Sequence, residues 1–394
     1  MIKTLKDIPE LKGKRVLVRV DFNVPMSGEI ITDDTRIVQT LPTIKYLIEK
    51  GAKVILMTHI GRPDGKIVEE LRTKPIAQHL ETLLNNKVLA LSETVGEKVE
   101  ESINKMEDGE IIFLENTRFY PGEEVNSEDF CGALAKLADI FINDAFATAH
   151  RLHASTAGVA DYIPAYAGLL IEKEIKFLNP LLNSSQESLT LIMGGAKVDT
   201  KIGVLKSYIG KANAILIGGA LANTFLAAQG HNIGESKYEK DKVDVARELM
   251  LLAEEKKQKF YLPIDSIVAD HISHDASAIN LPIEDIEGDM KILDIGKKTQ
   301  VIYQELIRES KCVLFNGPMG LYEYKQFASG TSAIARELVL NPKVESYLGG
   351  GDTIDAIKRD GFTEEQFTFV STGGGATLEF LEGKELPGIA VLKL

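Results

Sequence analysis

The chain has 394 residues, of which 44% are hydrophobic and 26% charged. These proportions are typical of a soluble globular protein, and the length predicts two domains, each able to bury a core of its own. The 45 basic and 58 acidic residues give a net charge of −13. A chain this acidic argues against non-specific binding to nucleic acid or to an anionic membrane, so its clustered basic residues are informative.

The cysteines and the apolar segments indicate a cytoplasmic protein. Cys131 and Cys312 are the only cysteines, and they form no Cys-x-x-Cys motif, so we expect reduced, buried thiols. The first residues, MIKTLKDIPELKGKR, lack the apolar segment of a signal peptide. The most apolar stretch, Ile215–Ala228, contains Asn223 and Thr224 and is too short to span a bilayer.

Short apolar segments alternate with helical patterns through the first half of the chain. Helices are expected at Arg36–Lys50, where Gly51 ends the pattern and Pro42 predicts a kink, at Pro75–Leu84 and at Asp129–Leu137. Strands are expected at Arg15–Val20, Lys53–Met57, Lys87–Leu91, Ile111–Leu114 and Ile140–Ile142. This alternation predicts a parallel sheet with helices on both faces.

The same pattern restarts after an amphipathic helix over Glu172–Leu182, which is followed by Asn183, Ser184 and Ser185. We place the domain boundary there. The predicted fold is α/β, with two Rossmann-like domains over residues 1–171 and 184–383, each a mostly parallel sheet, joined by a hinge helix over 172–183. Strands of the second domain are expected at Leu189–Met193, Ala214–Ile217, Lys259–Leu262, Lys311–Phe315 and Gln366–Val370.

Polar and glycine-rich residues follow the strand ends in both halves, which is where open α/β sheets bind ligands. In the first half, guanidinium groups suit a small, multiply anionic ligand, and Asp21 and Asn23 can hydrogen-bond a hydroxyl. For any one arginine, a surface ion pair remains the alternative. Arg19 lies within the strand and is set aside as structural. The candidates are Asp21, Asn23, Arg36, His59, Arg62, Arg118, His150 and Arg151.

The second half offers a polyphosphate site. The strand Leu189–Met193 stops at Gly194-Gly195, and we expect the next helix to carry Lys197 and Lys201 on one face. A surface turn with two solvated lysines is the alternative. Two glycine triplets are expected to open helices at Thr353 and Ala376, and Asp352 is either a helix cap or a Mg²⁺ ligand. The further candidates are Gly218, Gly219, Asn316, Glu323, Gly350, Gly351, Thr353, Gly373 and Gly374.

Two motifs are rejected. The pairs His271/His274 and His150/His153 have a spacing that zinc sites use, but neither has a nearby Cys or an HExxH frame. Gly210-Lys211 is not a P-loop, because Ala212 stands where Ser or Thr is required.

These motifs together resemble the phosphoglycerate kinase family from end to end. Small departures from the family pattern are Met26, Ile60, Ala147, Leu152 and Tyr322, none of them at a charged site position. The matching segments are VLVRVDFNVP (Val16–Pro25), DDTRI (Asp33–Ile37), HIGRP (His59–Pro63), LENTRF (Leu114–Phe119), NDAF (Asn143–Phe146), AHRLHAST (Ala149–Thr156), GGAKVDTK (Gly194–Lys201), FNGPMG (Phe315–Gly320), GGGDT (Gly349–Thr353) and STGGGATLEFLEG (Ser371–Gly383).

The resemblance implies a monomeric, cytoplasmic, glycolytic enzyme that moves a phosphoryl group between 1,3-bisphosphoglycerate and ADP, giving 3-phosphoglycerate and ATP, with Mg²⁺. It implies that domain 1–171 holds the phosphoglycerate, that domain 184–383 holds the nucleotide, and that the tail 384–394 returns to the first domain.

It also implies the roles of the candidates. The phosphoglycerate would be bound by Asp21, Asn23, Arg36, His59, Arg62, Arg118 and Arg151. The nucleotide would be bound by Lys201, Glu323 and Gly350–Thr353, with Asp352 near the metal. The transferring phosphoryl group would be surrounded by Arg36, Lys197, Gly373 and Gly374.

The residue types also fit the chemistry. A carboxylate acceptor is already ionised at neutral pH, so catalysis needs positioning and charge neutralisation and no general base. Because the ligands belong to separate domains, we expect closure about the hinge helix. A dinucleotide-dependent oxidoreductase would need G-x-G-x-x-G after a first strand, where the chain has DFNVP and GGAKVDTK. A non-catalytic metabolite-binding protein would have no need of the lysine pair.

Overall fold

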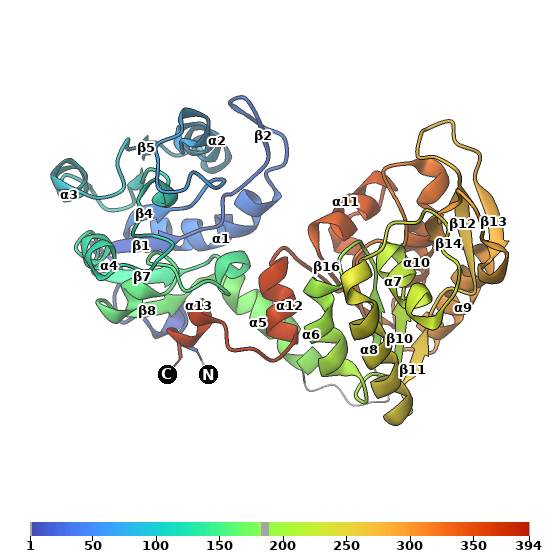
Figure 1. Ribbon diagram of the computed structural model, residues 1–394. Helices are drawn as coiled ribbons and strands as arrows, with labels where there is room; N and C mark the ends of the chain where they lie inside the picture. Colours follow the sequence, from blue (N-terminus) through green and yellow to red (C-terminus); the bar gives the residue numbers. More distant parts are fainter. Residues whose placement is uncertain (1, 183–188, 394) are drawn as a thin grey trace. The chain divides into compact units, whose positions relative to one another are not determined.

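The computed structural model describes residues 2–182 and 189–393, which form two compact units (Figure 1). The N-terminal unit comprises Met1–Lys176 with Glu385–Leu394, and the C-terminal unit comprises Phe177–Lys384. Helix α5 (Leu169–Leu182) contains the division between them and covers most of the helix expected at 172–183. The segment Asn183–Ser185, where the boundary was predicted, lies outside the described residues.

The N-terminal unit is built on a six-stranded sheet in the order β5-β6-β4-β1-β7-β8, with every pairing parallel. Its strands are β1 (Arg15–Arg19), β4 (Lys53–Met57), β5 (Val88–Ala90), β6 (Ile111–Phe113), β7 (Ile140–Asn143) and β8 (Ala165–Ala167). The flanking elements are the hairpin β2 (Met26–Ser27) and β3 (Ile30–Ile31) and the helices α1 (Thr35–Glu49), α2 (Lys74–Leu84), α3 (Glu97–Asn104), α4 (Glu128–Ala135) and α13 (Pro387–Ala390).

Helices cover both faces of this sheet, so its central strands are apolar on both sides (Figure 1). Val16, Val18, Leu56 and Phe113 lie in one buried cluster. Helix α1 continues through Pro42. The C-terminal tail belongs to this unit, because Lys3 N donates to Leu392 O at 2.7 Å and Asn143 Nδ2 donates to Gly388 O at 2.9 Å.

The C-terminal unit repeats the architecture with the order β11-β10-β9-β15-β16-β17. Numbered along the chain this is 3-2-1-4-5-6, the doubly wound order, so the topological switch point lies between β9 and β15. Its strands are β9 (Leu189–Met193), β10 (Ala214–Ile217), β11 (Lys259–Tyr261), β15 (Cys312–Asn316), β16 (Glu345–Gly349) and β17 (Phe369–Ser371). Its helices are α6 (Asp199–Tyr208), α7 (Gly219–Gln229), α8 (Val243–Glu255), α9 (Lys297–Arg308), α10 (Ser329–Leu340), α11 (Gly351–Arg359) and α12 (Gly375–Leu381).

The predicted fold class, two α/β domains with parallel sheets, is confirmed, but several strands were not predicted. The N-terminal sheet has a sixth strand, β8, beyond the five that were expected. Strand β16 was not predicted, because Glu345 and Ser346 interrupt the apolar pattern, although Ser346 is buried. A second sheet, antiparallel and in the order β13-β12-β14, was also missed: β12 (Asp265–Ala269), β13 (Ile279–Pro282) and β14 (Lys291–Ile295). Among the described residues, no helix is long and apolar enough to cross a membrane.

Candidate active site

The predicted anion-binding residues of the N-terminal unit gather at the carboxyl edge of its sheet. Asp21 and Asn23 follow β1, His59 follows β4, and Arg118 lies in the short helix Thr117–Phe119 after β6. Arg36 in the first turn of α1 donates from Nη1 to Asp21 Oδ2 at 2.8 Å and to Asn23 O at 3.2 Å. Because parallel strands end at the same edge, residues far apart in sequence form one cluster here.

The backbone of Gly61 connects two members of this cluster. Asn23 Oδ1 accepts a hydrogen bond from Gly61 N at 3.0 Å, and Arg118 Nη1 donates to Gly61 O at 2.7 Å. Arg118 is buried, and its Nε lies 3.0 Å from Glu124 Oε1. The loop after β4 therefore holds Asn23 and Arg118 in place, while Arg62 in the same loop is exposed.

Electrostatics show that the arginines form a cluster. Burial lowers the pKa of His59 far below its usual value, and the positive charges of Arg19, Arg118, Arg151 and Arg36 lower it further. Burial also lowers the pKa of Arg118, with Arg151 and Arg62 acting in the same direction. The predicted arginines are thus close enough to one another to lower the pKa of the same residues, and His59 is neutral among them.

Arg19, set aside from the sequence as structural, belongs to this cluster. Its side chain is 1% exposed, its Nε donates to Ser155 Oγ at 2.8 Å, and its Nη2 lies 3.1 Å from His59 Nδ1. A guanidinium group only donates, so Nδ1 of the neutral His59 accepts, and the imidazole carries its proton on Nε2. Since His59 is neutral, its 3.9 Å approach to Asp21 is not an ion pair.

The rejected histidine pairs lie in unlike surroundings. His153 is buried, and burial followed by Arg118 and Arg151 lowers its pKa to about 4, so it is neutral. His271 contacts Asp270 Oδ1 at 2.6 Å, and His274 packs against Tyr324. Within the described parts of the chain, no group of three or more His, Cys, Asp or Glu side chains is arranged to hold a metal.

In the C-terminal unit the glycine turns meet at the switch point between β9 and β15. A Cβ atom on Gly219, which has φ +62°, would lie 2.6 Å from Gly195 N and 2.7 Å from Pro318 O. A Cβ atom on Gly218 would lie 2.4 Å from Met319 Sδ. The amides of both residues donate to the carbonyls of Met193 and Met319. These two glycines therefore allow three strand ends to pack closely, and their amides are already engaged.

Of the two lysines that were expected on one helix, only Lys201 lies in a helix. Lys201 lies in α6 and is 6% exposed, and its Nζ donates to Asn316 Oδ1 at 2.8 Å and to Asn316 O at 3.3 Å. Burial lowers the pKa of Lys201 to about 8, while Asp352 acts in the opposite direction. Lys197 is exposed and precedes α6, which begins at Asp199. The expectation that both lysines share one helical face is wrong.

The predicted glycine–helix junctions follow β16 and β17. Helix α11 begins at Gly351, and Thr353 Oγ1 accepts from Gly317 N at 2.7 Å, which connects the ends of β16 and β15. The exposed Asp352 lies in the first turn of α11. After β17, Gly373 N donates to Ser371 Oγ at 3.2 Å, and Gly374 at φ +55° precedes α12.

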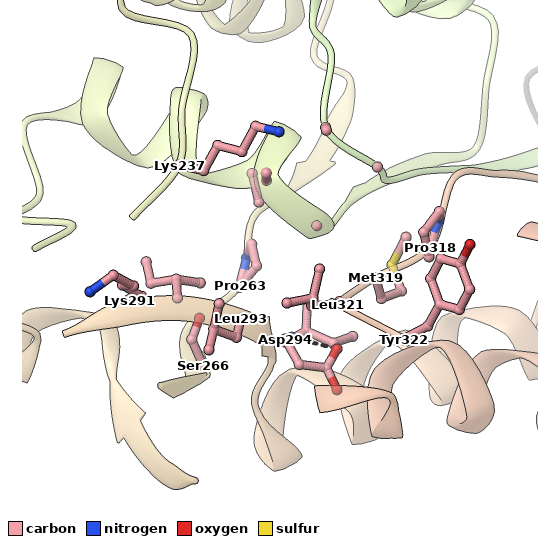
Figure 2. Close-up of a pocket in the computed structure, with 18 of the residues that line it drawn as sticks. Lys237, Pro263, Ser266, Lys291, Leu293, Asp294, Pro318, Met319, Leu321 and Tyr322 are labelled. Carbon is pink, nitrogen blue, oxygen red and sulfur yellow. Dashed lines mark hydrogen bonds between the residues drawn. The ribbon is translucent and has the colours of Figure 1, made fainter. Parts of the chain in front are cut away.

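A cavity of about 320 Å³ lies beside these turns, within the C-terminal unit (Figure 2). Its walls include four predicted residues, namely Gly195 and Gly219 at the turns and Glu323 and Asp352 beyond them. Most of the remaining wall is apolar and was not predicted as a binding site. It comes from the turn after β11, from the antiparallel sheet with its connections, and from the segment after β15: Pro263, Ile272, Leu293, Pro318, Met319 and Leu321. An apolar cavity with a few polar groups is suited to a flat organic ring.

The N-terminal unit carries an arginine cluster. The C-terminal unit carries a buried lysine, glycine turns and a ring-sized cavity. These features define a phosphotransferase of the two-domain α/β class. The sequence model described as phosphoglycerate kinase matches residues 5–384. The phosphoglycerate kinase of Dictyoglomus turgidum is 51% identical over 393 residues, which cover 99% of each chain.

Solved structures agree. The phosphoglycerate kinase of Coxiella burnetii is similar with a TM-score of 0.88 and 40% identity, covering 100% of this chain and 99% of that one. The phosphoglycerate kinase of Pyrococcus horikoshii OT3 is similar with a TM-score of 0.86 and 34% identity, covering 99% and 98%. The chain belongs to the phosphoglycerate kinase family.

Membership confirms the predicted function and enzyme class. The chain is a glycolytic phosphotransferase that moves the acyl phosphate of 1,3-bisphosphoglycerate to ADP, giving 3-phosphoglycerate and ATP, reversibly. The oxidoreductase and the non-catalytic binding protein are not favoured.

Proposed function

We propose that the N-terminal unit binds 3-phosphoglycerate or 1,3-bisphosphoglycerate and that the C-terminal unit binds ADP or ATP with Mg²⁺. The observation that carries this proposal is the gathering of Arg36, Arg118 and Arg151 around a neutral His59 at one sheet edge. Guanidinium groups that share one neighbourhood repel one another, and a multiply anionic ligand offsets that repulsion.

In the N-terminal unit, the substrate's phosphate and carboxylate are held by guanidinium groups. Arg62, Arg118 and Arg151 supply these, and His59 donates from Nε2. Asp21 and Asn23 orient the substrate hydroxyl, supported by their hydrogen bonds to Arg36 and Gly61. Each contact needs a planar fork or a neutral donor, which explains why these residue types are present.

In the C-terminal unit, the base lies in the 320 Å³ cavity and the phosphates extend toward Lys201. Glu323 at the cavity wall accepts from the ribose, and Gly350–Thr353 with Asn316 border the phosphates. Gly218 and Gly219 contribute by leaving space for close packing.

The residues present fit one Mg²⁺ ion. Asp352 is exposed at the start of α11, borders the cavity and influences the pKa of Lys201, so it lies near the expected phosphates. Mg²⁺ usually takes one or two protein carboxylates and completes its shell with phosphate and water, so a single carboxylate suffices. When bound, the ion neutralises charge on the nucleotide phosphates.

Catalysis then consists of holding charge in place. Arg36, Lys197 and the turn at Gly373-Gly374 surround the transferring phosphoryl group, whose charge is spread over its oxygens in the transition state. The 3-phosphoglycerate carboxylate is already ionised, so no residue needs to remove a proton. The neutral state of His59 is consistent with this, because a binding donor requires no proton exchange.

We further propose that the enzyme is a cytoplasmic monomer. Its net charge of −13 and its two buried, unpaired cysteines are consistent with a reducing compartment.

The assay that tests the proposal couples ADP formation from 3-phosphoglycerate and MgATP to a visible reaction. We expect turnover that requires both substrates and the metal. Equilibrium titration of the isolated ligands assigns the sites: R118M should weaken 3-phosphoglycerate binding and leave ADP binding intact, and K201M should do the reverse. Loss of both ligands from either variant would contradict the division between the units.

A further inference from the structure

Glu123 is a fully buried glutamate of the N-terminal unit to which the proposed function assigns no role. It lies in the connection between β6 and α4, five residues after Arg118. Its carboxylate accepts hydrogen bonds from Thr117 Oγ1 at 3.3 Å, from Ser155 N at 2.9 Å and from the hydroxyl of Ser155. A buried carboxylate that is satisfied in this way holds its donors in fixed places.

The donors to Glu123 belong to the two segments that carry substrate arginines. Thr117 directly precedes Arg118 in the short helix Thr117–Phe119. Ser155 follows Arg151 by four residues, and Ala154 N donates to the backbone carbonyl of Glu123 at 3.0 Å. The segments after β6 and β7 are therefore joined at Glu123, close to where each of them presents an arginine.

The hydroxyl of Ser155 extends this connection to the substrate histidine. Ser155 Oγ donates its only proton to Glu123, so it is left to accept from Arg19 Nε at 2.8 Å. Arg19 Nη2 in turn lies 3.1 Å from Nδ1 of His59, which keeps the imidazole proton on Nε2. The orientation of one hydroxyl group thus determines how Arg19 meets His59.

Electrostatics also place Glu123 close to both buried guanidinium groups. Burial lowers the pKa of Arg19 and that of Arg118, and the negative charge of Glu123 opposes the shift in each case. A carboxylate in this position repels an anionic substrate. Any favourable contribution of Glu123 to substrate binding must therefore come from the groups that it holds and not from its charge.

We propose that Glu123 and Ser155 are positioning residues of the phosphoglycerate site, which fix the arrangement of its arginines and of the His59 imidazole. This inference rests on the proposed substrate site. Cations that are held in place before the substrate arrives lose little side-chain freedom when it binds, so binding is stronger. Glu123 and Ser155 act through Arg19, Thr117 and the backbone of the loops.

The experiment compares two variants that break this network with one that does not. S155A removes the hydroxyl and leaves every charge in place, so it keeps the test valid if E123Q does not fold. E123Q keeps the size but replaces one acceptor oxygen with an NH2 group, which cannot accept from Ser155. E128Q is the matched control, because Glu128 is an exposed glutamate at the start of α4.

Calorimetry measures Kd for 3-phosphoglycerate and for ADP, steady-state kinetics measure KM and kcat, and nitrogen NMR measures the tautomer of His59. We expect S155A and E123Q to raise Kd and KM for 3-phosphoglycerate about five- to tenfold, with kcat and Kd for ADP within about twofold of wild type. His59 should become a mixture of tautomers. E128Q should match the wild type. When combined with H59A, S155A should add less than about twofold, because the hydroxyl acts through His59.

Three results would overturn the inference while leaving the substrate site intact. The first is an unchanged Kd for 3-phosphoglycerate and an unchanged His59 spectrum in S155A. The second is tighter binding of 3-phosphoglycerate by E123Q, since Glu123 would then act through its charge. The third is a lower kcat at unchanged KM, because partial unfolding removes active enzyme without altering the affinity of the rest. Failure of the wild type to bind 3-phosphoglycerate would overturn the proposed site and this inference together.

Discussion

Arg19 offers a sharp test of whether the buried charge in the substrate cluster is structural, functional or both. Its guanidinium is 1% exposed and reaches Glu123, which is 0% exposed, through the hydroxyl of Ser155. Replacing Arg19 with Met removes the nearer positive charge from the buried Glu123 carboxylate and leaves only the influence of Arg118. Removal of one partner from a buried charge pair typically costs about 3–5 kcal/mol, a large share of a total stability of about 5–15 kcal/mol.

The same strand provides a matched control. Arg15 at the other end of β1 pairs with Asp139 at 2.7 Å, but both side chains are about one-third exposed. An exposed pair of this kind contributes about 0–1 kcal/mol. We therefore expect R15M to lower the free energy of unfolding by less than about 1 kcal/mol, and R19M by several times as much.

Urea unfolding followed by circular dichroism measures both variants. Because Cys131 is buried in the N-terminal unit and Cys312 in the C-terminal unit, labelling of each thiol reports which unit opens. The additional variant E123Q separates charge from packing: combined with R19M it should recover part of the loss, since no unpaired carboxylate remains. Nitrogen NMR should show His59 protonated on Nε2 in the wild type and as a mixture of tautomers in R19M. Equal losses in R15M and R19M, with no recovery by E123Q, would refute the buried-pair argument.

Two further predictions concern the transferred group. R36A should lower kcat by orders of magnitude, because the developing charge loses a held partner; steady-state kinetics check this, and a rise in KM at constant kcat would make Arg36 a binding residue only. K201M should weaken ADP binding about 10- to 100-fold, because a charge-assisted hydrogen bond is lost. The pKa of Lys201 is about 8, so calorimetric titrations should show wild-type affinity for ADP falling as pH rises through 8, while the affinity of K201M does not change with pH. The same pH profile in both proteins would contradict this role.

The sequence predicts the sheet edges well because each site begins where an apolar run stops. Strands β1, β4 and β9 end in buried residues and are followed directly by polar or glycine residues. Asp21 and His59 therefore lie at one edge of the N-terminal sheet, and Gly194 lies at the corresponding edge of the C-terminal sheet; the order of strands is not needed to predict this.

The start of α6 could not be predicted, because a distant residue influences it. The amide of Val198 donates to the carboxylate of Glu239, 41 residues further along the chain. With Val198 capped there, the helix begins at Asp199 and Lys197 remains outside it. The spacing of Lys197 and Lys201 alone is equally consistent with one continuous helix, so local pattern predicted the wrong geometry.

The burial of Arg19 is hidden for a similar reason. An arginine in a strand is ordinarily at a surface, and its partner Ser155 is 136 residues away in the sequence. The cavity escaped prediction because its walls come from the antiparallel sheet, whose strands carry polar residues such as Asp265 and Asn280 among the apolar ones. In each case the structure depends on a contact between segments that are distant in the sequence, which local patterns do not reveal.

In three helices, backbone amides of the first turn donate hydrogen bonds to a buried aspartate from another part of the chain. These aspartates lead to a last prediction. Asp144 Oδ1 accepts from Leu170 N at 2.8 Å and from Ile171 N at 3.2 Å at the start of α5. Asp294 accepts from Gly330 N at 2.7 Å in α10. Asp265 accepts from Thr299 N at 2.8 Å in α9. A glycine makes room for each carboxylate, since Cβ atoms on Gly168, Gly296 and Gly330 would lie within 2.3 Å of it.

The three carboxylates differ in their pKa. Burial raises the pKa of Asp144 and of Asp294 to about 7, because their hydrogen-bond donors do not compensate fully for the loss of water. Burial also acts to raise the pKa of Asp265, but hydrogen bonds from Thr299, Asn280 and Lys298 outweigh it, so that pKa is lowered. Asp265 is also less deeply enclosed than Asp144 and Asp294, so the depth of burial and the hydrogen-bond donors together decide the sign of the pKa shift.

The sign of the pH dependence follows. Between the unfolded value of 3.8 and about 7, folded Asp144 binds a proton that the unfolded chain has released, so stability falls as pH rises through this range. The full effect is on the order of 4 kcal/mol, since each pKa unit corresponds to about 1.36 kcal/mol. D144N, which cannot ionise, should remove this slope from the urea midpoint of the N-terminal unit, read by Cys131 labelling from pH 5 to 8 against the unfolded chain at each pH. D265N, read by Cys312, should shift the midpoint of the C-terminal unit by a constant amount, because Asp265 is ionised in both states throughout that range. If D144N keeps the wild-type slope between pH 5 and 7, burial does not raise the pKa of Asp144, and the argument fails.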